Sequence, residues 1–464
     1  MKNTSIWTKY NKKELKELET FTDSYVNFIS NNKTERECVD TIVSEIEAEG
    51  YVNINKAIAA GKKLKAGDKI YAVNMNKSLI MFNVGTEPLE NGVNILGAHI
   101  DSPRLDVKAN PLYEDNDLAY LDTHYYGGIK KYQWVTIPLA LHGVVVKKDG
   151  TTVIVNLGEE DDDPVFFISD LLIHLSQEQL EKKAAKVIEG EDLDIIIGNM
   201  PKNFTEEEKE EKEAVKASIL DILKEQYGIE EEDFLSAELE IVPAGKAKSA
   251  GFDKSMVIGY GQDDRVCAFP SYKAMLQVKK VKRSAVCILT DKEEIGSVGA
   301  TGMQSMFFEN TMAEILNMTG EFSDIKLRRM LANSNMLSSD VSSAFDPSFA
   351  SSFDKKNVAY LSRGMVLCKF TGSRGKSGSN DANAEYLGAL RSIFDKDKVQ
   401  FQLAELGKVD LGGGGTIAYM LAKYGMNVID CGVAVLNMHA PMEVTSKADI
   451  YETYRGYISF IKNM

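Results

Sequence analysis

The pattern of apolar residues changes twice along the chain, and these two changes constrain the fold most. Residues 1–102 combine helical patterns with buried strands, and the same alternation of strands and helices returns after residue 246. Residues 103–245 instead carry short alternating strands, followed by a helical pattern from Val165 and an acidic stretch. Strands interleaved with helices are typical of an α/β sheet. The sequence therefore predicts one α/β domain, residues 1–102 plus 246–464, interrupted by an inserted smaller domain, residues 103–245.

Within the larger domain, several elements can be placed by periodicity. Apolar residues recur at helical spacing from Leu15 to Ile29, and Thr34 with Glu37 forms a capping box that opens a second helix ending at Gly50. Further strands and helices are predicted, in chain order, at 79–82, 93–98, 266–280, 285–290, 365–370, 382–394 and 399–403, with a last helix after the glycines at 412–415.

Bulk composition narrows the class of protein. A chain of 464 residues with 44% apolar side chains is longer than a single hydrophobic core normally supports, so we expect two folding units. A formal charge of -15 disfavours nucleic acid and anionic membranes as partners. Residues 1–10 lack an apolar signal region, and no stretch approaches a membrane span of about 20 apolar residues.

The five cysteines include no C-x-x-C pair, so we expect a cytoplasmic protein with reduced thiols. The acidic run from Glu206 to Glu211 is predicted to be a solvated helix face.

Two adjacent carboxylates, Glu293 and Glu294, follow the buried strand that ends near Thr290. Neighbouring side chains diverge, so one carboxylate can bind a metal ion while the other takes a proton from water. An exposed loop pair is the simpler interpretation when such residues stand alone.

Other residues of types that bind metal ions also lie at the ends of predicted strands. His99 and Asp101 lie two apart at a strand end, which suits an imidazole held by a carboxylate. Asp340 and His439 each follow an apolar strand, and Asp263 precedes a helix, where an N-cap is the alternative. The five candidate metal ligands offer enough nitrogen and oxygen atoms for two ions of zinc, cobalt or manganese. They are His99, Asp263, Glu294, Asp340 and His439.

The order of these motifs resembles one known family. The segments that carry the likeness are 97–103 (GAHIDSP), 262–264 (QDD), 291–297 (DKEEIGS), 339–340 (SD) and 438–439 (MH). They are similar to the aminopeptidase I / aspartyl aminopeptidase family of di-metal (zinc) metallopeptidases across nearly the whole chain. The resemblance implies a mixed-sheet, helix-flanked di-zinc exopeptidase domain with an inserted β-rich dimerisation domain.

The resemblance also implies a role for each residue. Asp263 matches the carboxylate that bridges the two ions, His99 with Asp340 completes one site, and Glu294 with His439 the other. Glu293 matches the general base, and Asp101 the residue that orients His99. The implied activity is metal-dependent removal of an acidic or neutral N-terminal residue from peptides, through a two-metal hydroxide mechanism.

Relatives in this family form dimers that assemble into a tetrahedral dodecamer, so the resemblance implies a homo-oligomer. His174 resembles a histidine that reaches into a neighbour's active site, with a helix-surface histidine in the dimer contact as the alternative. Lys369 resembles a lysine near the substrate side chain, where a fixed cation favours acidic residues, although edge lysines are common.

The sequence departs from the family pattern in places that affect specificity. Residues 341–347 lack the usual histidine, and Asp264 replaces an asparagine. Two other functions therefore stay open: an amidohydrolase that deacylates N-acyl amino acids, or an endo-acting peptidase, on the same scaffold, and a non-catalytic assembly or cargo protein.

Overall fold

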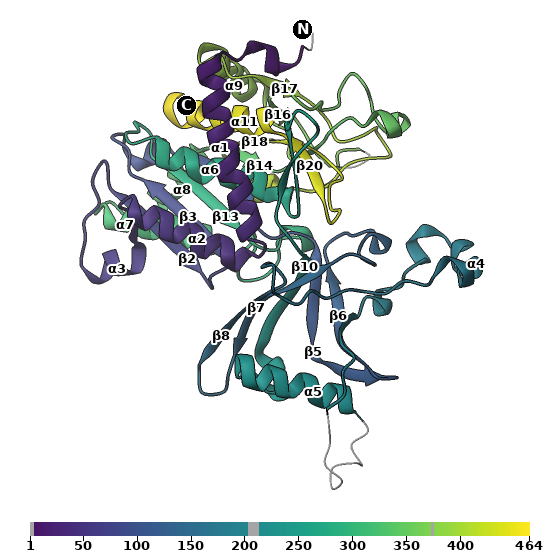
Figure 1. Cartoon of the computed structure of the whole chain (residues 1–464). Coiled ribbons are helices and arrows are strands. Elements are labelled where there is room, and N and C mark those ends of the chain that lie inside the picture. The colour runs from purple at the N-terminus through teal and green to yellow at the C-terminus, as the bar shows by residue number, and fades with distance from the viewer. Residues whose placement is uncertain (1–3, 203–212, 373–374) are drawn as a thin grey trace. The chain divides into compact units, whose positions relative to one another are not determined.

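The computed structural model describes residues 4–202, 213–372 and 375–464, which form two compact units (Figure 1). Unit 1 comprises Met1–Ser102, Ala247–Met438 and Glu443–Met464, and unit 2 comprises Pro103–Lys246 and His439–Met442. The short segment 439–442 differs from the expected division. It groups with unit 2, in which the ring nitrogen Nδ1 of His439 lies 2.8 Å from the carbonyl oxygen of Gly128.

A nine-stranded mixed sheet forms the centre of unit 1. Its middle strands β13, β4, β14 and β18 are parallel, and β2 and β3 pair antiparallel toward one edge. In spatial order the strands are β1 (Val52–Asn53), β2 (Lys69–Asn74), β3 (Ser78–Asn83), β13 (Ala285–Thr290), β4 (Asn94–His99), β14 (Asn335–Ser339), β18 (Asn427–Gly432), β16 (Met365–Cys368) and β17 (Phe401–Leu403).

A smaller five-stranded sheet completes the strands of unit 1. In spatial order it contains β11 (Lys248–Ala250), β12 (Met256–Gly259), β20 (Glu443–Ser446), β19 (Ala434–Leu436) and β15 (Ser342–Ser343). Pairing of β12 with β20 places Gly259 opposite Glu443.

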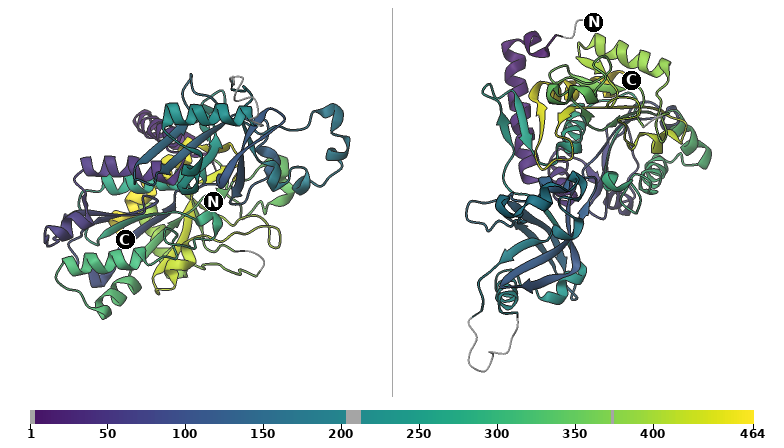
Figure 2. Two further views of the ribbon diagram at one scale, coloured as in Figure 1. Left: turned by 90° about the horizontal axis from the view of Figure 1, so that it is seen from below. Right: turned by 90° about the vertical axis from the view of Figure 1, so that its right-hand side faces the viewer.

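Helices cover the nine-stranded sheet, and alternate strand residues face two separate cores. In β3, Leu79 and Met81 belong to one core, whereas Ile80 and Phe82 belong to the other. The first core includes residues of α1 (Lys12–Asn31), α2 (Glu35–Ala48), α6 (Gln262–Gln277), α9 (Ala384–Lys396) and α11 (Lys447–Asn463). The second includes residues of α3 (Ile54–Ala59), α7 (Phe307–Met318), α8 (Asp324–Ala332) and α10 (Ala418–Ala422). Figure 2 shows these helices from two further directions.

Unit 2 is built on a six-stranded antiparallel sheet. In spatial order its strands are β8 (Thr152–Leu157), β7 (Leu139–Val146), β10 (Ala237–Pro243), β5 (Arg104–Asp115), β6 (Leu118–Tyr126) and β9 (Ile195–Gly198). Helix α5 (Ala214–Ile222) contacts β5, β6 and β9, and α4 (Gln177–Leu180) is a single turn (Figure 1).

Most of the predicted elements are present, and one is wrong. The capping box of Thr34 and Glu37 opens α2, and strands or helices occupy each range named above for the larger domain. The helical pattern from Val165 is wrong, because Phe166 and Ile168 are buried while Val165 and Phe167 are exposed. This period of two belongs to extended chain, and Phe166 forms a β-bridge with Leu139.

The acidic run from Glu206 to Glu211 lies outside the described residues. Within the described ranges, no helix combines the length and the apolar character needed to cross a membrane.

Candidate metal centre

The polar residues of the site follow the carboxyl ends of neighbouring parallel strands. Strand β4 ends at His99, β14 is followed by Asp340, and β13 is followed by the loop that carries Glu293 and Glu294. Because β4 lies between β13 and β14 in the sheet, these ends meet at one edge. Crevices at the carboxyl ends of strands are where open α/β sheets bind ligands.

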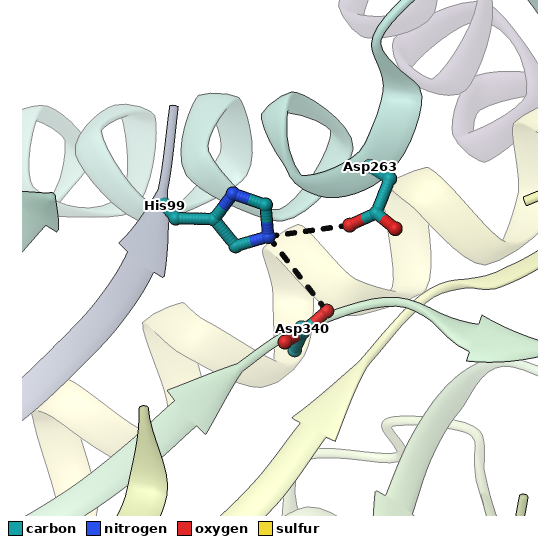
Figure 3. A group of neighbouring side chains, drawn as sticks. All are labelled: His99, Asp263 and Asp340. Carbon is teal, nitrogen blue, oxygen red and sulfur yellow. Dashed lines mark ion pairs between the residues drawn. The ribbon is translucent and has the colours of Figure 1, made fainter. Parts of the chain in front are cut away.

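Three of the predicted ligands form a tight group around the imidazole of His99 (Figure 3). Its Nε2 atom lies 3.2 Å from Asp263 Oδ1 and 3.9 Å from Asp340 Oδ1. Glu293 Oε2 lies 4.0 Å from the same nitrogen. The ligand atoms of His99, Asp263 and Asp340 all fall within 4.8 Å of one another. One imidazole nitrogen and two carboxylates in this space form a donor set that fits zinc.

Asp263 takes its position from an irregular start to α6. The helix as a whole begins after Gly261, which has φ +70° and makes no side-chain cap hydrogen bond. Asp263 itself is non-helical, with φ -78° and ψ 108°. Its N–H donates to Glu443 Oε2 at 3.0 Å, and its carbonyl accepts from Ser102 Oγ at 2.6 Å. The backbone on both sides of the carboxylate is therefore held.

Asp101 contacts three functional groups at once. His99 Nδ1 lies 3.0 Å from the Asp101 carbonyl oxygen and 3.3 Å from its carboxylate oxygen Oδ1. The two carboxylate oxygens accept the N–H groups of Glu293, at 3.1 Å, and Glu294, at 3.2 Å. Asp101 thus orients the imidazole partly through its backbone, and its carboxylate holds the short helical turn Glu293–Ile295.

The closely spaced carboxyl groups of this site shift the pKa values of its members. Burial raises the pKa of Asp340 well above its usual range, and the charges of Glu293 and Asp263 raise it further. Burial lowers the pKa of His99, but hydrogen bonds with Asp101 and Asp263 outweigh this effect and raise the pKa above its ordinary value. Carboxylates gathered this closely around an imidazole are stabilised by a cation among them.

Asp340 is held by the neighbouring strand. Its N–H donates to the carbonyl of Cys431 at 2.8 Å. Gly432 follows, and a Cβ atom there would lie only 2.0 Å from the Asp340 carbonyl oxygen. Only glycine therefore permits this approach of β18 to Asp340.

Sequence reasoning missed a group of supporting residues. Glu443 is buried and accepts the N–H of Asp263, while Gln262 donates from Nε2 to the carbonyl oxygen of Glu443 at 2.6 Å. Tyr25 in turn lies 3.2 Å, hydroxyl to Oε1, from Gln262. The only sequence signal for Glu443 is its position four residues after His439.

The remaining predicted residues lie in different surroundings. The Nδ1 atom of His439 lies 2.8 Å from the carbonyl oxygen of Gly128. The other ring nitrogen, Nε2, is the atom that can bind a metal ion. Lys369 is exposed, and its Nζ lies 3.9 Å from Asp381 Oδ1. His174 lies in an exposed 3-10 turn, Ile173–Leu175, whose two apolar residues are 69% and 67% exposed.

Comparisons with a family model, with known proteins and with solved structures show what this chain is similar to. Residues 28–461 match the family described as "Aminopeptidase I zinc metalloprotease (M18)". The chain is 63% identical, over 99% of its length and 98% of the relative, to "Probable M18 family aminopeptidase 1" of Clostridium acetobutylicum. A crystal structure of an M18 family aminopeptidase from Thermotoga maritima superimposes with a TM-score of 0.94 at 42% identity, covering all of both chains. The solved aminopeptidase I from C. acetobutylicum gives 0.93 at 60% identity, again over all of both chains. The chain belongs to the M18 family, and it is a zinc metalloprotease of the aminopeptidase class.

Proposed function

We propose that this chain releases single N-terminal residues from peptides with the help of two divalent ions. The observation that carries the proposal is the group of His99, Asp263 and Asp340, with the Glu293 carboxylate 4.0 Å from the imidazole. A metal-binding set beside a separate carboxylate has the parts needed for hydrolysis at neutral pH.

The two ions are divided among five ligands in this proposal. His99, Asp263 and Asp340 would hold one ion. By the resemblance to the family, Glu294 and His439 would hold the other, and Asp263 would contribute to both sites. The hydrogen bond of His439 Nδ1 to a backbone carbonyl supports this role, because metal-binding histidines commonly donate their second nitrogen in this way. When bound, such ions act as Lewis acids and make water acidic enough to ionise near neutral pH.

Glu293 carries the proton in the proposed reaction. Its Oε2 accepts a proton from the attacking water and later delivers it to the nitrogen of the leaving peptide. The Asp101 carboxylate keeps the backbone of Glu293 in place through the N–H hydrogen bond at 3.1 Å. The proposed substrate has a free amine at its N-terminus, and the cut is exopeptidic.

A panel of X-Ala-Ala peptides tests this function in zinc-loaded protein, beside Glu293→Gln. We expect release of one residue, reduced by about 10²- to 10⁴-fold in the variant while zinc content stays the same. N-acetylated peptides should not be cleaved, whereas cleavage of blocked substrates alone would favour the deacylase. An inactive but zinc-loaded wild type would favour the non-catalytic assembly protein. Preference for Asp or Glu at X, lost in Lys369→Ala, would assign specificity to Lys369.

We also propose that unit 2 mediates dimerisation and that dimers build a tetrahedral dodecamer. The exposed apolar residues around His174, among them Leu172, Ile173 and Leu175, support a contact surface there. The Saccharomyces cerevisiae protein mApe1, described as a dodecamer, shares the fold with a TM-score of 0.74 at 20% identity. In such an assembly His174 reaches the active site of a neighbouring subunit.

Mixed oligomers separate this role of His174 from a purely structural one. Glu293→Gln and His174→Ala chains, carrying different tags, are co-expressed and purified through both tags. Each variant alone is expected to be inactive, whereas a mixed pair contains one site with an intact Glu293 and the neighbour's intact His174. Recovered activity supports the proposal, and its absence in a correctly assembled mixture contradicts it. Native mass measurement reports the assembly.

A further inference from the structure

Unit 2 contains a partly open apolar cavity that has no part in the proposed reaction. The cavity has a volume of about 200 Å³ and lies between the six-stranded sheet and α5 with the turn that follows it. Thirteen of its fifteen lining residues are apolar. On the sheet side, the lining residues Leu121, Val155 and Leu239 are buried, and each belongs to a different strand.

The helical wall of the cavity becomes more exposed along its length. Near the start of α5, Val215 is completely buried. At its end, Ile222 lines the cavity and is still 36% exposed. The chain then widens into a π-helical turn, Leu223–Tyr227, which ends at Gly228 in the left-handed conformation. Single π turns occur frequently at functional sites, and this one supplies three of the lining residues.

Size and lining define what the cavity can hold. Apolar cavities of about 150 Å³ stay free of water and bind compact apolar molecules such as benzene. Among the described residues that line the cavity, Gln226 and Tyr227 are the polar ones, and both belong to the π turn. We propose that this cavity binds a small, uncharged aromatic or short alkyl molecule with one hydrogen-bonding group, which the π turn receives.

Indole is a suitable probe because it combines an aromatic body with one N–H donor. Calorimetric titration of zinc-loaded wild-type protein should show saturable binding of one indole per chain. Val155→Phe fills the cavity from the sheet and should weaken binding at least tenfold. Ile154→Phe is the matched control, because Ile154 precedes Val155 in β8 and is 75% exposed. It should bind indole as the wild type does.

Leu223→Phe repeats the test from the helical wall, so a folding defect in one variant does not decide the outcome. Circular dichroism checks that each variant is folded. Loss of binding in the filling variants, with binding retained in Ile154→Phe, supports the site. Absence of saturable binding to the wild type, or equal binding to the folded filling variants, overturns it and identifies the cavity as a packing defect.

Discussion

Gly432→Ala tests how closely Asp340 must be held. The added Cβ would lie 2.0 Å from the Asp340 carbonyl oxygen, where real contacts stay above 3.0 Å. The two strands must therefore separate by about 1 Å, because both contacting groups are backbone or fixed to it. A displacement of about 1 Å in a catalytic constellation can reduce the rate about 100-fold. We expect kcat/KM to fall by this order, with weaker zinc binding.

The assay combines release of the N-terminal residue with zinc affinity measured by competition against a chelator. Gly388→Ala is the matched control, because Gly388 lies in α9 and a Cβ there meets no atom within 4 Å. This control should keep full activity and gain about 0.4–1 kcal/mol of stability. If folded Gly432→Ala protein binds zinc and turns over as the wild type does, the proposed dependence on the position of Asp340 is refuted.

Three further predictions follow from the same contacts. Asp101→Asn should lower zinc affinity or activity 10- to 100-fold, since the amide cannot accept both N–H groups of Glu293 and Glu294; unchanged kinetics and zinc binding would contradict this. Removal of zinc by a chelator should abolish activity and lower Tm, and added zinc should restore both, whereas full activity of the metal-free protein would argue against metal catalysis. Burial raises the pKa of Asp449 to about 7, so the folded protein is more stable when this carboxyl group is protonated than when it is ionised. The stability of the wild type relative to Asp449→Asn should therefore fall as pH rises from about 4 to about 7; urea unfolding measures it, and a pH-independent difference would contradict it.

Local sequence signals predicted much of the fold. The capping box at Thr34 and the apolar run of β13 depend on neighbours within a few residues, so they can be recognised without the rest of the chain. The helical pattern from Val165 failed because a short apolar segment fits both a helix and a strand until its partner is known. Here the partner of Phe166 is Leu139, which lies outside the segment.

The supporting residues of the site were beyond local reasoning. Glu443 accepts a hydrogen bond from the N–H of Asp263, although 180 sequence positions separate the two residues. The pairing of Gly259 with Glu443 brings β20 close to the start of α6. No pattern around Glu443 reveals that register, because strand pairing is decided by the whole sheet.

By itself, the sequence determined which residue types close each strand. His99 and Asp340 follow apolar runs, and the chain must leave the sheet where those runs end. Only the tertiary structure decided that these ends meet. Strands β13, β4 and β14 come from residues 285–290, 94–99 and 335–339, and their spatial order places β4 between the other two. The distance of 3.9 Å between His99 Nε2 and Asp340 Oδ1 follows from that strand order. Burial of both faces of the sheet selects the order, and no single segment encodes it.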